Sequence, residues 1–512
     1  MRKQFIRTRK VRFAVITAIL TALVITVTVL SNAVFGTLAK RYGWYTSMLP
    51  KSNYDVTEAC YALLGEAFEA QGDAEVEILF CDVEENLLAD STQRYLYHTA
   101  TSLAERYPDQ LKITCYDIWT NPNTVRDYAK RVDPLTGEEE AVAIKSTSVI
   151  VVSEDYYRVY SLEEFFVFKG GQASDVWAYN GERKLAAGIL RAIAEEKRTV
   201  CLTNNHGEVF YDYELLYLLD DAGYDIVYLD LYKEAIPDGC DMIISYNPNS
   251  DLIADDELSS VSETEILDAF LAEEGNSFWV FLEDGTPALP RMEQYLNTWG
   301  FDFGYYESAE TGAKYRYMVQ DNSQSLTSDG YTIYGSPVQT GHSAELLAGL
   351  ERKVVFKNAT AMKAAQGFVA KGDGSYEKGD RTLYSLYQSG ENAVSWANGK
   401  PVNGEGAMLM GMTEQRTASG SSYVGVISSV DFSAEEFLQS AVYGNGDAFL
   451  HMMKNMGVEH LPEGLTIKPF ASSDISTVTT AQMLRWTVGL SLAPAVLFTA
   501  TAVAVLLKRR RA

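Results

Sequence analysis

The stretch Thr199-Val-Cys-Leu-Thr-Asn-Asn-His-Gly-Glu208 places an apolar run directly before a polar loop, and a segment with helical apolar spacing follows at 211–222. An apolar run bounded by polar turn residues is typical of a buried strand. A strand, a loop and a helix in this order form the repeating unit of a parallel sheet covered by helices. We therefore predict an α/β fold.

The pattern of this unit continues along the chain. The alternation of buried-type strands with helices favours a doubly wound, flavodoxin-like parallel sheet. Helix 181–197 precedes the sheet, and the domain is predicted to span 181–456. Its further elements are strands at 225–230, 242–245, 278–282 and 423–428 and helices at 263–273 and 447–455. Residues 303–400 are rich in Tyr, Gly and Ser, which predicts an antiparallel or loop-rich insertion.

A smaller α/β domain is predicted upstream, at residues 75–180. Its sequence order is strand 76–80, helix 90–107, strand 111–118 and then two strands at 148–153 and 156–161. This order predicts a parallel pair followed by an antiparallel pair, as in a thioredoxin-like domain. The redox motif is missing, because Cys81 is followed by Asp82-Val-Glu with no second cysteine in a Cys-x-x-Cys pair.

Both ends of the chain carry long apolar segments. Residues 13–36 and 485–507 are long enough to cross a bilayer as helices. Basic residues crowd the tails 1–12 and 508–512, so the positive-inside rule predicts cytoplasmic termini, a cell-membrane protein and an extracytoplasmic central domain. A membrane-proximal helix within 37–74 and a connector at 457–484 would join this ectodomain to the two spans. A cleaved signal peptide and a buried core helix are the alternatives for these apolar segments.

Composition excludes several classes of partner. The chain has 43 Lys and Arg against 69 Asp and Glu, so an acidic body is a poor match for nucleic acid. The five cysteines have no metal-ligand spacing and are expected to be buried thiols, with one disulfide left open. The sequence contains no P-loop, no Gly-x-Ser-x-Gly and no His-Glu-x-x-His. We predict no cofactor, no metal and no recognisable catalytic residue.

The loop Asn204, Asn205, His206, Gly207, Glu208 is the candidate site. It follows a predicted parallel strand, and open α/β sheets bind ligands at the carboxyl ends of their strands. His206 beside Glu208 could act as an acid or base, with Cys201 nearby in sequence. Alternatively, Gly207 supplies a backbone angle while His206 and Glu208 hold the loop together.

Short motifs in a fixed order resemble the gliding-motility-type auxiliary components of ABC transporters. They extend over most of the chain between the two apolar ends. In that family's Gly-His-Gly-Glu motif, Asn205 stands in place of the first Gly. The motifs are 53–80 with Thr57, Val200–Glu208, Ile236–Ile244, Pro248, Glu265, Phe278–Leu282, Ser428–Phe432 and Asn445–Asp447. The resemblance implies a non-enzymatic, membrane-anchored accessory or substrate-binding-like subunit, with ATPase and permease on separate chains. It also implies a central domain like the class I glutamine amidotransferases, without their catalytic machinery.

Two other functions remain open at this point. One is a membrane-tethered hydrolase or amidase that uses His206, Glu208 and Cys201. The other is a structural or adhesive envelope protein that binds through the Tyr-rich residues 303–400.

Overall fold

The structure is a computed structural model, and it describes residues 55–470. The gaps in this range are 73, 91, 133–138, 169–175, 196, 211–212, 255–261, 284–287, 311, 398–399, 404–405 and 418–419.

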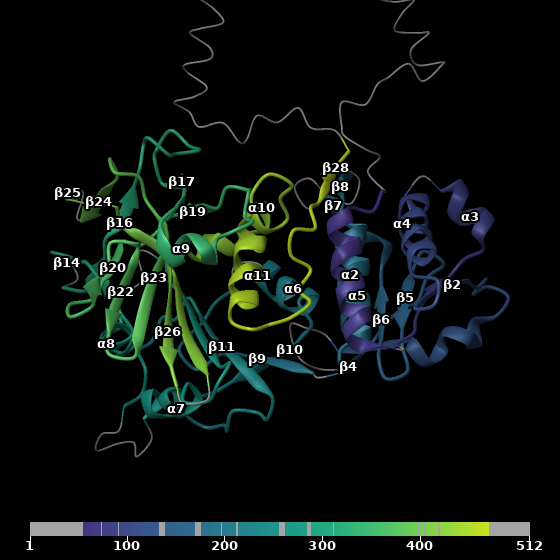
Figure 1. Cartoon of the computed structure of the whole chain (residues 1–512), viewed down its shortest axis with the longest axis horizontal. Coiled ribbons are helices and arrows are strands. Elements are labelled where there is room, and N and C mark those ends of the chain that lie inside the picture. The colour runs from purple at the N-terminus through teal and green to yellow at the C-terminus, as the bar shows by residue number, and fades with distance from the viewer. Residues whose placement is uncertain are drawn as a thin grey trace, which may run out of the picture. The chain divides into compact units, whose positions relative to one another are not determined.

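The upstream part contains a sheet of four strands in the order β2-β1-β5-β6. Strand β1 pairs with β2 in parallel and with β5 in antiparallel fashion, and β5 pairs with β6. Both predicted pairs are therefore confirmed. The strands are β1 (Val76–Phe80), β2 (Leu111–Cys115), β5 (Val149–Val152) and β6 (Tyr157–Tyr160), and this part lies in the right half of Figure 1.

Helices α2 (Glu58–Gln71), α4 (Gln93–Arg106) and α5 (Gly181–Ile193) pack against this sheet. Helix α2 falls within the region 37–74 in which a helix was predicted, and the Thr57 side chain caps it by accepting a hydrogen bond from the Cys60 backbone N–H at 3.3 Å. Helix α3 (Glu84–Ala89) was not predicted. The sequence pattern also did not predict the short elements η1 (Pro122–Tyr128), β3 (Lys130–Val132), β4 (Glu139–Ala141), η2 (Leu162–Phe165), β7 (Phe166–Phe168) and β8 (Val176–Tyr179).

The second sheet is larger and of mixed direction. Its first five strands run in the order β10-β9-β11-β12-β27, and each neighbouring pair is parallel. Antiparallel strands β26, β23, β22 and β21 then extend it. The parallel strands are β9 (Arg198–Thr203), β10 (Tyr224–Leu229), β11 (Cys240–Tyr246), β12 (Ser277–Phe281) and β27 (Ser421–Ile427). The antiparallel strands are β21 (Val369–Ala370), β22 (Ser375–Lys378), β23 (Arg381–Gln388) and β26 (Met408–Arg416).

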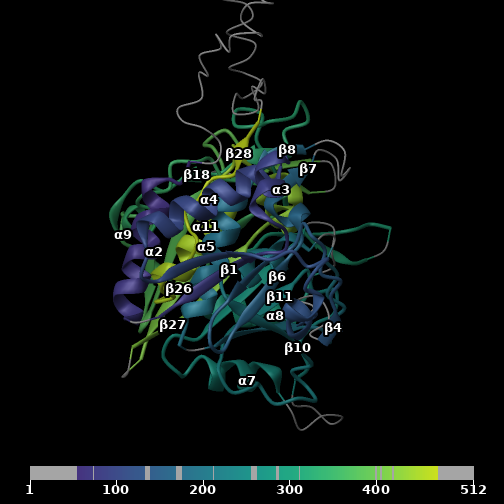
Figure 2. The ribbon, with the colours of Figure 1, turned by 90° about the vertical axis from the view of Figure 1, so that its right-hand side faces the viewer.

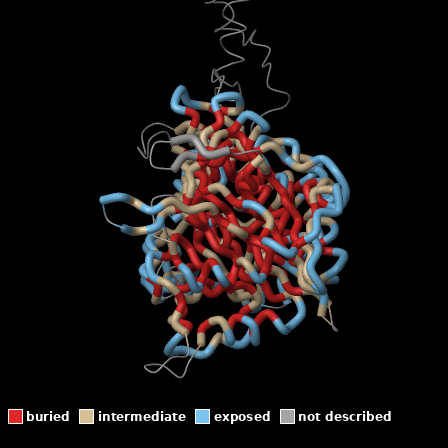
Figure 3. Tube along the Cα trace, turned by 90° about the vertical axis from the view of Figure 1, so that its left-hand side faces the viewer, coloured by how far each residue is buried: buried red, intermediate tan, exposed pale blue. Residues whose placement is uncertain are grey.

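Helices cover both faces of the parallel strands. Side chains alternate between the two faces of a strand, so Leu202 and Phe281 pack with α6 and α11, whereas Cys201 and Val280 pack with α7 and α8. Figure 2 shows α11 above α8 in this view, and Figure 3 shows the buried residues of this part gathered inside an exposed periphery. The helices are α6 (Glu214–Asp221), α7 (Glu263–Phe270), α8 (Pro290–Thr298), α10 (Glu435–Leu438) and α11 (Asn445–Asn455).

Residues 303–400 form short antiparallel pieces, as predicted, and some of these pieces extend the large sheet. Strands β22 and β23 belong to the large sheet itself, and β20 pairs with β26. The remaining elements are β13 (Phe301–Phe303), β14 (Tyr305–Glu307), β15 (Lys314–Arg316), β16 (Met318–Gln320), β17 (Thr332–Tyr334), β18 (Ser336–Pro337), α9 (Gly341–Leu346), β19 (Val355–Lys357), β20 (Met362–Ala364), β24 (Val394–Ala397), β25 (Lys400–Asn403) and η4 (Val430–Ser433).

The predicted connector 457–484 returns to the upstream part in its described residues. Strand β28 (Lys468–Pro469) pairs with β8, and the Phe470 ring lies 5.2 Å from that of Tyr95. Lys468 also forms an ion pair with the buried Glu182 of α5.

The predicted localisation has to be corrected. Within the described residues, no helix combines the length and apolar character needed to cross a lipid bilayer. The segments 13–36 and 485–507, on which the prediction was based, lie outside the described residues, as do the tails 1–12 and 508–512. The prediction of a membrane-anchored chain with two spans is therefore withdrawn.

A glycine pair tests the packing of the large sheet. A Cβ on Gly425 of β27 would stand 2.3 Å from the ring of the fully buried Trp279, so Gly425→Ala should lower the free energy of unfolding by about 1–3 kcal/mol. At Gly446 of α11 the nearest atoms would be 3.8 Å away, so Gly446→Ala should be neutral or stabilise by about 0.5–1 kcal/mol. Denaturant unfolding measures both, and equal effects would contradict the predicted overpacking at Gly425.

Candidate functional site

The predicted loop lies at the point where the strand order of the large sheet reverses. Strands β10 and β11 flank β9 on opposite sides, so the chain leads from β9 and from β11 to helices on opposite faces of the sheet, α6 and α7. A crevice at such a position is the usual ligand site of an open α/β sheet. Residues 204–208 follow β9 and residues 247–253 follow β11, and the two loops are hydrogen-bonded to each other.

His206 fills this position and is buried. Its side chain is 1% exposed, and its Nε2 donates to Oε2 of Glu263 at 2.8 Å. The Nδ1 atom donates to Oε1 of Glu208 at the longer distance of 3.3 Å. The carboxylates are also buried, with side-chain exposures of 2% for Glu208 and 0% for Glu263. Both imidazole nitrogens are therefore occupied by carboxylates of the chain itself.

The charges of this triad stabilise one another. Burial alone would lower the pKa of His206, but the hydrogen bonds to Glu208 and Glu263 outweigh it and raise the pKa to about 9. For the carboxyl groups burial acts in the opposite direction, yet the hydrogen bonds from His206 keep the pKa of Glu208 and that of Glu263 below the usual value. At neutral pH the triad is thus an imidazolium between two carboxylates.

The triad holds three segments of backbone together. The carbonyl of His206 accepts from the N–H groups of Asn249 and Ser250, both at 2.8 Å. Oε2 of Glu263 accepts from the Ile253 N–H at 2.6 Å. The Asn205 side chain donates to the other oxygen of Glu263 at 2.7 Å. Loop 204–208, loop 247–253 and the first turn of α7 are therefore joined through His206 and Glu263.

The remaining residues of the predicted site have structural roles. Gly207 has a φ of 72°, a left-handed conformation that favours glycine, and its carbonyl accepts from the Asn249 side chain. Asn204 is exposed and its backbone N–H donates to Leu229 of β10 at 3.2 Å. The Thr203 hydroxyl donates to Glu208. The loop-holding interpretation therefore describes all five residues better than acid or base chemistry does.

Cys201 does not join this group. It lies within β9, is fully buried, and packs on the face covered by α7 and α8. No hydrogen bond links it to His206 in the described part of the chain. All five cysteines are free thiols. Four of them are buried and Cys115 is half-buried.

The sequence pattern missed Glu263. The predicted helix began at this residue, but no acid was assigned to His206 other than Glu208. The separation of 57 residues between His206 and Glu263 leaves no spacing signal, and only the adjacency of β9 and β11 brings them together.

Other acidic residues close turns and helix ends. Asp230 accepts from the backbone of Tyr232 at 3.1 Å, and Asp251 accepts from the first-turn N–H of Met292 at 2.9 Å. Among the described residues, no group of three or more His, Cys, Asp and Glu side chains is arranged to hold a metal ion.

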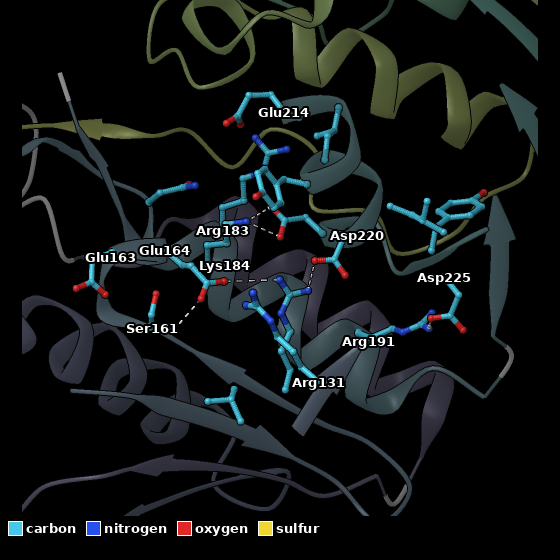
Figure 4. A pocket seen from close by; sticks show the side chains of 18 of the residues that line it. Arg131, Ser161, Glu163, Glu164, Arg183, Lys184, Arg191, Glu214, Asp220 and Asp225 are labelled. Carbon is cyan, nitrogen blue, oxygen red and sulfur yellow. Dashed lines mark hydrogen bonds and ion pairs between the residues drawn. The ribbon is translucent and has the colours of Figure 1, made fainter. Parts of the chain in front are cut away.

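A large cavity lies elsewhere and does not include His206. It has a volume of about 1130 Å³ and lies between β6, an edge strand of the first sheet, and β10, an edge strand of the second. Helices α5 and α6 also line it (Figure 4). Charged side chains dominate its walls, including Arg158, Arg183 and Asp220. Nothing in the sequence pattern indicated this cavity.

A matched pair of substitutions tests the triad. Glu263→Gln removes a buried charged hydrogen bond to His206, so it should lower the free energy of unfolding by about 1.5–3 kcal/mol. Glu265→Gln, on the exposed face of the same helix, should have an effect within about 0.5 kcal/mol. Chemical denaturation measures both, and a Glu263→Gln variant as stable as Glu265→Gln would contradict the structural role.

The raised pKa of His206 gives stability a pH dependence. The stabilisation is fully present below the unfolded-state pKa of 6.5 and is lost as pH rises towards about 9. A shift of this size corresponds to about 3 kcal/mol. The free energy of unfolding should therefore fall between pH 6.5 and 9.5 by that much more in the unaltered chain than in His206→Gln. Parallel pH profiles for the two proteins would exclude a charged His206.

Comparisons with known proteins give no family. No protein-family model matches the chain, and no curated protein matches it. Among solved structures, the structure of PurLQS from Thermotoga maritima superposes with a TM-score of 0.27 and 14% sequence identity. The match covers 51% of this chain and 100% of that one. A TM-score this low does not establish a shared fold, so the chain is assigned to no family.

Proposed function

We propose that this chain is a non-enzymatic binding protein that serves as an accessory or substrate-binding-like subunit of an ABC transport system. In this proposal the ATPase and the permease are separate chains. The upstream part would be a thioredoxin-like domain and the second part a flavodoxin- or amidotransferase-like domain that has lost catalysis.

The non-enzymatic part of the proposal rests on one observation: both ring nitrogens of His206 are bound by carboxylates of the chain itself. A general acid or base must reach the proton that it transfers, within about 2.6–3.2 Å or through one water. Both nitrogens of His206 are instead bound to Glu208 and Glu263, and its side chain is 1% exposed. This geometry disfavours the hydrolase or amidase alternative, which requires His206 to meet a substrate and Cys201 to stand beside it.

The strand order supports the finer fold assignment. In chain order, β9, β10, β11, β12 and β27 follow the 2-1-3-4-5 arrangement of flavodoxin-like sheets. Flavodoxin-like sheets bind ligands where the strand order reverses. In this chain the reversal lies between β9 and β11, and the triad of His206, Glu208 and Glu263 occupies it. A binding role is therefore expected to use another surface.

The transport assignment rests on the ordered sequence motifs and on the missing P-loop. A chain without a phosphate-binding loop would depend on a separate ATPase for energy. The motifs that resemble the auxiliary components lie in structured segments: Thr57 caps α2, residues 200–208 include the end of β9 and its loop, and Asn445–Asp447 begin α11.

Co-purification tests this function. The tagged full-length chain, isolated from its own cells after mild cross-linking, should recover a P-loop ATPase and a polytopic permease in stable ratios. The same tag on an unrelated acidic protein is the control. Recovery of neither chain would contradict the transport assignment, and turnover that is lost in His206→Gln would contradict the non-enzymatic one.

A further inference from the structure

Arg183 is a buried cation without a counterion among the described residues. The residue lines the large cavity from α5 and is 7% exposed, and its Nε is fully buried without a hydrogen-bond partner. No described residue forms an ion pair or hydrogen bond with Arg183. Its Nη1 lies 3.9 Å from the position that a Cβ on Gly446 would take, at the first turn of α11. The amino end of a helix is itself positive, so this neighbour adds to the uncompensated charge.

The other buried cations of the cavity are paired. Arg158 forms ion pairs with Asp220 and Glu164, and Lys184 binds both oxygens of Asp221 at 2.7 Å. Arg191 pairs with Asp225 at 2.6 Å. The labelled carboxylate beside Arg183 in the view of Figure 4 is Glu214, which accepts a hydrogen bond from the Gln439 side chain at 2.6 Å.

A second polar group near the start of α5 also lacks a hydrogen-bond partner within the described part of the chain. Asn180, one helical turn before Arg183, lines the same cavity and is 9% exposed, and its Oδ1 is buried with no hydrogen bond. Leaving a buried polar group or charge unpaired costs free energy, so such groups are expected to find a partner. A carboxylate suits Arg183, since its guanidinium donates in a fork that matches two carboxylate oxygens. The amide of Asn180 could accept from a ligand N–H.

The rest of the cavity wall selects for positive charge. Apart from Arg183, ten of its lining residues are acidic and six are basic. A polyanion such as a nucleotide would meet net repulsion there, whereas a ligand with one carboxylate and additional cationic groups would be complementary.

The shape of the cavity favours an extended ligand. Strands β6 and β10 are each the last strand of their sheet, so each has one edge without a strand partner among the described residues, and both line the cavity. An extended peptide can pair with such an edge through its backbone. Arg183 and Arg191 lie eight residues apart on α5, which is about 12 Å along the helix or about four extended residues.

From these observations we infer that the cavity between β6 and β10 binds a short basic peptide by its free C-terminal carboxylate, with Arg183 as the anchor. The inference deepens the proposed binding role and rests on it. Peptide binding to the purified chain and recovery of transporter chains are separate measurements. Failure of the first alone overturns this site, and failure of the second alone overturns the transport assignment.

Calorimetric titration of the full-length chain tests the site. The probe is the pentapeptide Ala-Lys-Ala-Lys-Ala with a free C-terminus, compared with the same peptide amidated, with free lysine and with inorganic phosphate. The free-acid peptide should bind at least tenfold more tightly than each of the other three. Equal binding of the amidated peptide would overturn the role of the carboxylate, and equal binding of lysine or phosphate would overturn the peptide assignment.

Variants localise the contact. Arg183→Gln should lower the affinity for the free-acid peptide at least tenfold and leave the affinity for the amidated peptide unchanged, because only the free carboxylate contacts the guanidinium. Lys197→Gln, which removes an exposed charge at the same cavity, should change affinity less than twofold. Without ligand, the thermal midpoint of Arg183→Gln should equal or exceed that of the unaltered chain, since an unpaired buried charge is removed. A lower midpoint with unchanged peptide affinity would show that Arg183 is structural and would overturn the inference.

Discussion

Parallel strands must be covered on both faces, and this constraint organises the second part of the chain. Strands β9, β11 and β12 are apolar on both sides, so they can be stable only between two layers of helices. Helices α6 and α11 form one layer, and α7 and α8 form the other. The loops that lead from the parallel strands to these helices leave the sheet at its carboxyl edge. The crowding of loops 204–208 and 247–253 at that edge follows from this arrangement.

Buried charge is handled in opposite ways at two places in the molecule. His206 is enclosed by two carboxylates and several backbone donors, so its charge is compensated and it fastens the loops together. Arg183 is buried to a similar degree, yet it has no counterion within the described residues. A compensated buried charge is a structural element, whereas an uncompensated one indicates a site for a charged ligand. His206, which the sequence pattern indicates as a candidate, is therefore enclosed by the chain itself. Arg183, which the pattern does not indicate, is the residue that can pair with a ligand.

Local patterns predicted many of the elements near their observed positions. Apolar alternation and helical spacing depend on neighbouring residues, so β9, β11, β12 and α11 were found with small errors at their ends. Side chains that cap the backbone set some helix ends, as Thr57 does for α2. Strands β22 and β23 were assigned to an insertion, because the sequence contains no signal for the partner that an antiparallel strand will choose. The membrane prediction relied on segments outside the described residues, and no described helix supports it.

The sequence by itself determined the α/β class, the position of the 204–208 loop after a parallel strand, and the absence of a phosphate-binding loop. These features depend on residues that are close together along the chain. Only the tertiary structure decided what His206 does, because Glu263 reaches it from 57 residues away through the pairing of β9 with β11. The cavity at Arg183 likewise exists only because the tertiary fold brings β6, β10 and α5 together around it. Charge compensation in a protein interior is a property of three-dimensional neighbours, and no sequence spacing encodes it.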